Sequence, residues 1–208
     1  MMETEGVASI ILAGGKSSRL GRDKASEVLL GRTLLQRAID RLDNLVDEHV
    51  IVTAQGQHLP DLEATARLTV VQDLYPGLGP LGGIYSGLSA TSKDCAVTLA
   101  CDMPLLQAAL PEAMLGILDN HDAVVPLNGL PEPLCAVYAT TCLPAILNRI
   151  NAGDLKMTSF YEAIDVLYLE PEAWRRFDPE GLSFLNVNKE EDLRRAEAIL
   201  ILEESSGT

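Results

Sequence analysis

The chain has 208 residues, 47% of them hydrophobic and 22% charged, which is ordinary for one globular domain with a buried core. Its 16 Lys and Arg residues against 30 Asp and Glu residues give a formal net charge of -14, which argues against nucleic-acid and anionic-membrane partners. The acidic N-terminal sequence and the absence of a run of roughly 20 apolar residues favour a cytoplasmic protein without a signal peptide or membrane span.

In the first part of the chain, apolar runs with β character alternate with stretches of helical spacing. Strands are expected at Val7 to Leu12, His49 to Ala54, Leu68 to Gln72, Cys95 to Cys101 and His121 to Leu127. Helices are expected from Thr33 as cap to Val46, from Leu81 to Ala90, and within Leu105 to Leu118, where Pro111 breaks or delays the helix. Because the strands are apolar throughout, this alternation predicts a parallel sheet covered on both faces.

The pattern changes after Leu127, where Asn128-Gly129 is a turn signal and PEPLCAVYAT predicts a strand that returns antiparallel. The later elements are helices at Leu143 to Ile150 and around Thr158 to Ile164, a strand at Val166 to Glu170, and a closing helix from about Lys189 to Leu202. Asn188 and Glu191 form a variant of the capping box at the start of that helix. The predicted fold class is α/β: a single doubly wound, Rossmann-like, mostly parallel sheet, with helices on both faces and an antiparallel addition in the C-terminal half.

The cysteines and histidines show no spacing typical of a metal site or a disulfide framework. No pair of cysteines has CxxC spacing, and no histidine clusters with them. We therefore interpret the four cysteines as small core residues in a reducing compartment; they are Cys95, Cys101, Cys135 and Cys142.

The segment LAGGKSSRLGRDK, Leu12 to Lys24, holds three glycines and four basic residues directly after the first strand. In an open α/β sheet, ligands bind outside the carboxyl ends of the strands, and glycines there let backbone N–H groups approach phosphate oxygens. Arg19 and Lys24 could neutralise such phosphates. The spacing is neither that of a P-loop nor GxGxxG, and a glycine-rich turn with solvated charges is an equal alternative at this point.

Two aspartates end other strands of the same predicted sheet, Asp73 in LTVVQD and Asp102 in CAVTLACD. Carboxylates beside bound phosphates need a divalent cation between them, and Mg²⁺ suits one or two carboxylates plus phosphate oxygens. Taken singly, each aspartate is more simply a turn or cap residue. Three aligned strand ends make that simple interpretation less favourable.

The segment PGLGPLGGIYSGL, Pro76 to Leu88, contains five glycines and two prolines, more than turn chemistry requires. Gly82 and Gly83 fall in the first turn of a predicted helix, where glycine costs helix stability. Close approach to a ligand or to a neighbouring strand is the expected reason. No linker or repeat divides residues 1–208, so we expect one domain, with a nucleotide held by about 7–127 and a second ligand by about 128–203.

Five motifs in this order resemble the molybdenum cofactor guanylyltransferases, the MobA family: LAGGKSSRLGRDKA, DLYPGLGPLGGI, ACDMPLL, PLCAVY and NVNKEEDL. They span Leu12 to Leu193, nearly the whole chain. The first is shared with the wider nucleotidyltransferase superfamily, whereas GPLGGI, PLCAVY and the late motif are typical of MobA-like members.

The resemblance implies a set of site residues. Nucleotide binding falls to Leu12, Ala13, Gly14, Gly15, Lys24, Asp73 and Gly82, and Asp102 binds both nucleotide and Mg²⁺. Asn186 and Asn188 fall near the pterin, although Asn188 also has the cap role given above. Arg19, Lys24 and Asp102 are the expected catalytic residues.

The implied reaction transfers GMP from GTP to the terminal phosphate of molybdopterin and releases pyrophosphate. The attacking phosphate is already a nucleophile, so catalysis depends on alignment and charge neutralisation. The residues leave open a cytidylyltransferase, a transferase for another phosphorylated small molecule, and a non-catalytic nucleotide-binding homologue. Besides the two substrates, the resemblance suggests transient contact with molybdoenzymes or their chaperones.

Overall fold

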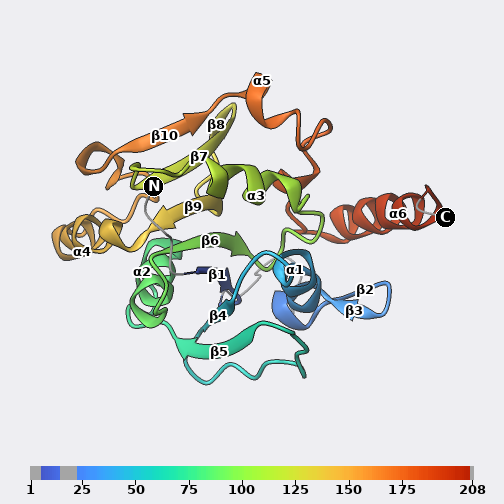
Figure 1. Cartoon of the computed structure of the whole chain (residues 1–208). Coiled ribbons are helices and arrows are strands. Elements are labelled where there is room, and N and C mark those ends of the chain that lie inside the picture. The colour runs from blue at the N-terminus through green and yellow to red at the C-terminus, as the bar shows by residue number, and fades with distance from the viewer. Residues whose placement is uncertain (1–5, 15–22, 207–208) are drawn as a thin grey trace.

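The computed structural model describes residues 6–14 and 23–206, in which the main sheet has the strand order β10-β7-β9-β6-β1-β4-β5, with β8 paired to β7 (Figure 1). Strand β9 is antiparallel to both of its neighbours, β6 and β7. The other neighbouring pairs along this order are parallel: β1 with β4, β1 with β6, β4 with β5, and β7 with β10. The mostly parallel sheet with an antiparallel addition is thereby confirmed. The strands are β1 (Val7–Leu12), β4 (Glu48–Thr53), β5 (Arg67–Gln72), β6 (Cys95–Ala100), β7 (Ala123–Asn128), β8 (Leu130–Pro131), β9 (Cys135–Ala139) and β10 (Val166–Leu169), with a separate hairpin of β2 (Val28–Leu29) and β3 (Arg32–Thr33).

Helices cover both faces of this sheet, with α2 and α4 on one side and α1 and α3 on the other (Figure 1). The last helix, α6, contributes Ala196 and Leu200 to a third buried cluster, which also contains Leu29 of β2 and Leu34 of α1. The helices are α1 (Leu34–Leu42), α2 (Pro80–Ala90), α3 (Ala109–Gly116), α4 (Leu143–Ala152), α5 (Pro171–Trp174) and α6 (Glu190–Ser206), with single 3₁₀ turns η1 (Lys24–Ser26), η2 (Thr140–Cys142), η3 (Tyr161–Ala163) and η4 (Leu182–Phe184).

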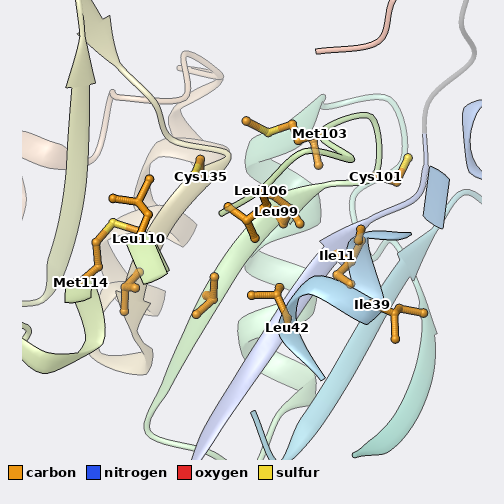
Figure 2. Close-up of a cluster of buried hydrophobic side chains, with 14 of the residues drawn as sticks. Ile11, Ile39, Leu42, Leu99, Cys101, Met103, Leu106, Leu110, Met114 and Cys135 are labelled. Atoms are coloured by element: carbon orange, nitrogen blue, oxygen red, sulfur yellow. The ribbon is translucent and has the colours of Figure 1, made fainter. Parts of the chain in front are cut away.

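The two faces of the sheet form two hydrophobic clusters, because neighbouring residues of a strand point to opposite sides. In β1, Ile11 belongs to the cluster under α1 and α3, and Ile10 to the cluster under α2 and α4. Figure 2 shows the first cluster, in which Leu42, Leu99 and Met114 come from different elements. Each fully buried aliphatic side chain of this kind contributes about 1.5–3 kcal/mol, so both faces hold the strand ends rigidly in place.

Two local predictions are confirmed at helix starts. Thr33 caps α1, and its Oγ1 accepts a hydrogen bond from the Gln36 N–H at 3.2 Å. Helix α3 begins late, at Ala109, with Pro111 in its first turn, where a missing N–H costs nothing.

Two other local predictions are wrong. The expected helix around Thr158 to Ile164 is only the short turn η3, because the adjacent side chains of Phe160 and Tyr161 are both buried against Tyr138. The capping box at α6 is also wrong, since the carboxylate that accepts from the N–H groups of Asn188 and Lys189 is that of Asp192, at 2.9 and 3.0 Å.

All four cysteines are buried and unpaired, as expected for small core residues. No helix among residues 6–14 and 23–206 is long and apolar enough to cross a membrane.

Candidate active site

The order of the strands creates a switch point between β1 and β6. The chain passes from β1 to β4 and β5 on one side, and then returns through α2 to β6 on the other side of β1. Leu12 and Ala100 are paired at the carboxyl ends of these two strands, and the Cys101 N–H donates to the Leu12 carbonyl at 3.2 Å. In open α/β sheets such a crevice is where ligands bind.

A cavity of about 820 Å³ opens at this edge of the sheet. This volume lies within the roughly 300–1,000 Å³ typical of small-molecule sites. The expected site residues that line it come from strand ends and from the segments around them: Leu12, Ala13, Gly14, Lys24, Asp73, Asp102, Asn186 and Asn188. Two more expected residues, Gly15 and Arg19, lie outside the described residues.

Lys24, which lines this cavity, contacts two distant parts of the chain. Its Nζ lies 2.5 Å from Asp102 Oδ2 and 2.6 Å from Asn188 Oδ1. The side chains of Lys24 and Asp102 are 18% and 14% exposed, so this ion pair is largely shielded from bulk water. The Asn188 side chain therefore contacts Lys24, and capping of α6 is done by Asp192.

The backbone fixes the position of Asp102 from two sides. The residue follows β6, whose strand is entirely buried, and its carbonyl accepts a hydrogen bond from the Val187 N–H at 2.8 Å. The second contact brings the segment that carries Asn186 and Asn188 to the end of β6. Residues from the beginning, middle and end of the chain thus meet at one point.

The second carboxylate oxygen of Asp102, Oδ1, is buried and has no hydrogen-bond partner among the described residues. A buried carboxylate oxygen without a partner is costly, and such an oxygen is a suitable ligand for a hard cation such as Mg²⁺. No group of three or more His, Cys, Asp or Glu residues in the described ranges could hold a metal ion. The residues therefore fit a cation that takes one protein carboxylate and completes its shell with phosphate oxygens and water.

Asp73 lines the cavity and also organises the turn before α2. Its Oδ1 accepts from the Tyr75 N–H at 2.9 Å and lies 2.9 Å from Ser86 Oγ, while its own N–H donates to the Thr53 carbonyl. The turn interpretation and the site interpretation of Asp73 are therefore compatible. Ser86, 2% exposed, is a supporting residue that the sequence pattern did not single out.

The glycines of α2 allow close packing against neighbouring segments. A Cβ on Gly82 would lie 3.0 Å from Tyr75 Cβ and 3.1 Å from the Tyr75 carbonyl oxygen, and a Cβ on Gly83 would lie 3.0 Å from Leu12 Cδ2. Gly83 borders the cavity, whereas Gly82 is not among its lining residues. The space that Gly82 leaves is used by Tyr75 and Asp73, and a direct contact of Gly82 with the nucleotide remains an untested prediction.

At the start of the glycine-rich segment, the N–H groups of Ala13 and Gly14 both donate to the Val52 carbonyl, at 2.9 and 3.1 Å. These two donors are thus already used within the protein. A second unpredicted residue, Gln57, contacts the Ala13 carbonyl from the turn after β4.

Cys101 lines the cavity next to Asp102, and its thiol is protonated at neutral pH. Burial, together with the nearby Asp102 carboxylate, raises the pKa of this thiol to about 12. Cys101 therefore offers no thiolate nucleophile.

Comparison with known proteins gives a consistent result. The MobA-like NTP transferase domain matches residues 9–167. The molybdenum cofactor guanylyltransferase of Desulfosudis oleivorans is 36% identical over 200 residues, which cover 94% of this chain and 96% of that protein. A probable molybdenum cofactor guanylyltransferase of Chloroflexus aggregans is 35% identical over 201 residues, which cover 93% and 95%.

Solved structures agree with the fold. The crystal structure of molybdopterin-guanine dinucleotide biosynthesis protein A from Archaeoglobus fulgidus superposes with a TM-score of 0.76 at 30% identity, covering 93% of this chain and 97% of that one. The 2-C-methyl-D-erythritol 4-phosphate cytidylyltransferase of Thermus thermophilus has a TM-score of 0.69 at 15% identity, covering 95% and 98%. At that identity the second likeness concerns the fold alone.

Proposed function

Because the chain belongs to the MobA-like NTP transferase family, we propose that it transfers GMP from GTP to molybdopterin, releasing pyrophosphate and forming the guanine dinucleotide cofactor. The relatives named molybdenum cofactor guanylyltransferase cover nearly its whole length, which supports this choice of nucleotide and acceptor.

The observation that carries the proposal is the contact of Lys24 with Asp102, which lines the cavity at the switch point and whose Oδ1 has no partner among the described residues. A cation and a carboxylate, both shielded from bulk water at the edge of an open α/β sheet, provide what a triphosphate requires. Lys24 would donate to phosphate oxygens and neutralise the charge that builds on the departing pyrophosphate. Arg19, on the same segment of the sequence, would share this role.

Asp102 would hold Mg²⁺ through Oδ1, the oxygen that has no partner in residues 6–14 and 23–206, with the remaining ligands coming from phosphate oxygens and water. The chemistry that the cation supplies when bound is neutralisation of negative charge on the triphosphate. Lys24 Nζ would then give up at least part of its contact with Asp102 and contact the phosphates instead. Its hydrogen bond to Asn188 Oδ1 would keep Lys24 Nζ within the cavity.

The acceptor would enter from the side of Asn186 and Asn188, which belong to the C-terminal half of the chain. The nucleotide would lie against Leu12 to Gly14 and Asp73 in the first half. Because the attacking group is a phosphate oxygen that is already ionised, the protein needs to align two polyanions rather than to deprotonate a nucleophile.

The test is turnover with each of the four nucleoside triphosphates plus molybdopterin and Mg²⁺, followed by pyrophosphate release. We expect release with GTP and much less with the other three. Preference for CTP would assign the chain to the cytidylyl branch, and nucleotide binding without release would indicate a non-catalytic homologue.

A further inference from the structure

We infer that Gln57 is a positioning residue, which fixes Lys24 relative to the nucleotide-binding end of β1. Gln57 lies in the turn after β4 and is not among the residues that line the cavity. Its amide nevertheless joins the two sequence flanks of residues 15–22. Ala13 is on one flank and Asp23 on the other.

All the donor capacity of the Gln57 amide is used in this junction. Its Nε2 donates to the Ala13 carbonyl at 3.0 Å and to the Asp23 carboxylate, with 3.0 Å to Oδ1 and 3.1 Å to Oδ2. Its Oε1 accepts from the Ala54 N–H at 3.0 Å. This pattern determines the orientation of the amide, because Ala13 and Asp23 present only acceptors and Ala54 presents only a donor.

Asp23 passes the constraint on to Lys24. The Asp23 carboxylate caps the 3₁₀ turn η1, which begins at Lys24, by accepting from the Ala25 N–H at 3.2 Å. Ala25 is fully buried, so the turn is anchored on its other side by the core. The Gln57 amide thus determines where η1 starts, and with it the origin of the Lys24 side chain that reaches Asp102.

An alternative is that Gln57 merely stabilises its own turn. That role needs only the Oε1 contact with Ala54 and predicts that loss of the amide changes stability without changing nucleotide affinity. The Nε2 contacts have a different consequence. They bind a cavity-lining residue, Ala13, to the residue next to Lys24, so their loss should act on the triphosphate.

The kinetic test of this inference rests on the proposed function, because it requires GMP transfer. The structural test does not, because it is made on the nucleotide-free protein. Gln57→Glu keeps the shape and the Oε1 acceptor but places a carboxylate against the Ala13 carbonyl and the Asp23 carboxylate. We expect the KM for GTP to rise about tenfold or more, with a smaller change in kcat and an unchanged KM for molybdopterin. Gln55→Glu, an exposed residue of the same turn, adds the same charge without these contacts and serves as control.

Rescue is the decisive measurement. In the double variant Gln57→Glu/Asp23→Asn, the amide donor moves to position 23 and the carboxylate to position 57, so the contact between these two side chains reforms with exchanged roles. We expect the double variant to recover the part of the GTP affinity that depends on the contact between positions 23 and 57, whereas the contact with the Ala13 carbonyl stays lost. Additive losses, or equal effects of Gln57→Glu and Gln55→Glu, would overturn the inference.

Hydrogen exchange of the Ala25 amide in the nucleotide-free protein separates this inference from the proposed function. Exchange should accelerate in Gln57→Glu and return toward the original rate in the double variant, whether or not the protein transfers GMP. If Gln57→Glu fails to fold, Gln57→Ala removes the donors without repulsion and should move both readouts in the same direction. Unchanged Ala25 exchange in Gln57→Ala would exclude the constraint.

Discussion

Two polar clusters in this protein contain residue types that enzymes use, and only one of them has the properties of a site. In the first, Ser9 Oγ lies 2.7 Å from His49 Nδ1, and His49 Nε2 lies 3.1 Å from Asp43 Oδ1. These are the residue types of a Ser–His–Asp triad, with the two ring nitrogens interchanged relative to the catalytic arrangement. In the second, Lys24 Nζ contacts Asp102 and Asn188.

The surroundings of the two clusters differ. Ser9 and His49 are 0% exposed, paired in the middle of β1 and β4, and absent from the cavity lining. Asp43 accepts further hydrogen bonds from the N–H groups of Thr65 and Ala66, so the cluster is closed and satisfied. Because a substrate cannot reach it, the cluster of Ser9, His49 and Asp43 has a structural role: it links the end of α1 and the segment before β5 to the sheet.

The Lys24 cluster lies instead at the carboxyl ends of the strands, beside a cavity, and leaves Asp102 Oδ1 without a partner in the described part of the chain. Among the described residues, what distinguishes a candidate site is an unsatisfied buried atom on a residue that lines a cavity. Resemblance to a catalytic constellation is the weaker criterion.

Asp102→Asn should have the largest effect. The amide keeps the shape but loses the charge that would hold Mg²⁺, so pyrophosphate release should fall by about three orders of magnitude or more. Melting temperature should change little, and excess Mg²⁺ or Mn²⁺ should restore part of the activity. Asp61→Asn, at an exposed position, is the control. A stable and fully active Asp102→Asn protein would remove Asp102 from the site.

Lys24→Ala should have the next largest effect. Loss of one shielded phosphate contact should cost about 2–4 kcal/mol of transition-state stabilisation, or about 30-fold to 1,000-fold in kcat/KM for GTP. The exposed Lys156 changed to Ala is the matched control. An unchanged kcat/KM would mean that another basic residue, with Arg19 the first candidate, holds the phosphates.

The positions of the strand ends could be predicted from the sequence, whereas the side-chain contacts at those ends could not. Asp73 and Asp102 could be placed on one edge because apolar runs of known direction end at them, and both line the cavity. The contact of Lys24 with Asn188 joins residues 164 positions apart and depends on how the last segment docks on β6. Periodicity carries no information about such a contact.

Single polar residues were missed for a related reason. Gln57 lies outside the motifs, and Ser86 does not stand out within the glycine-rich segment Pro76 to Leu88. Each matters through the particular atoms it reaches, the Ala13 carbonyl for Gln57 and the Asp73 carboxylate for Ser86. The helix expected near Thr158 failed because side-chain burial of Phe160 and Tyr161 outweighed local helical spacing.

Ser9→Ala should affect stability and leave activity unchanged. Without the Ser9 hydroxyl, His49 Nδ1 loses its hydrogen bond at a buried position, which should cost about 1–3 kcal/mol in the free energy of unfolding. Thr98→Val is a matched control in β6, because the buried Thr98 Oγ1 has no partner among the described residues and its loss should be neutral or stabilising. A large fall in kcat with normal stability would contradict the structural role of this cluster.

The smallest predicted effect is a pH dependence of stability that arises from the same closed cluster. Burial lowers the pKa of His49 below its usual value near 6.5, despite the opposing effect of Asp43. The carboxylate of Asp43 can only accept a hydrogen bond, so Nε2 carries the hydrogen and donates it to Asp43. The other ring nitrogen, Nδ1, then accepts a hydrogen bond from the Ser9 hydroxyl, and both bonds are consistent with an uncharged histidine. As pH falls below 6.5, the unfolded chain binds a proton at this residue that the folded chain does not bind.

The contribution of His49 to the free energy of unfolding should therefore be constant above pH 7. It should decrease as pH falls through 6.5, by at most about 1.4 kcal/mol per pH unit for one proton. A second decrease should follow at lower pH. Although burial acts against ionisation of Asp43, hydrogen bonds from Ala66 and Thr65 lower its pKa from 3.8 to about 2, so the contribution of Asp43 to stability is lost as pH falls between these two values.

Urea midpoints measured from pH 8 to pH 5 test the decrease that is due to His49. His121→Asn is the control, because replacing the partly exposed His121 should not remove the dependence of the midpoint on pH. A midpoint that stays flat over this range, or that increases as the pH falls, would show that His49 can take up a proton in the folded protein, and the cluster would then be more accessible than its burial indicates.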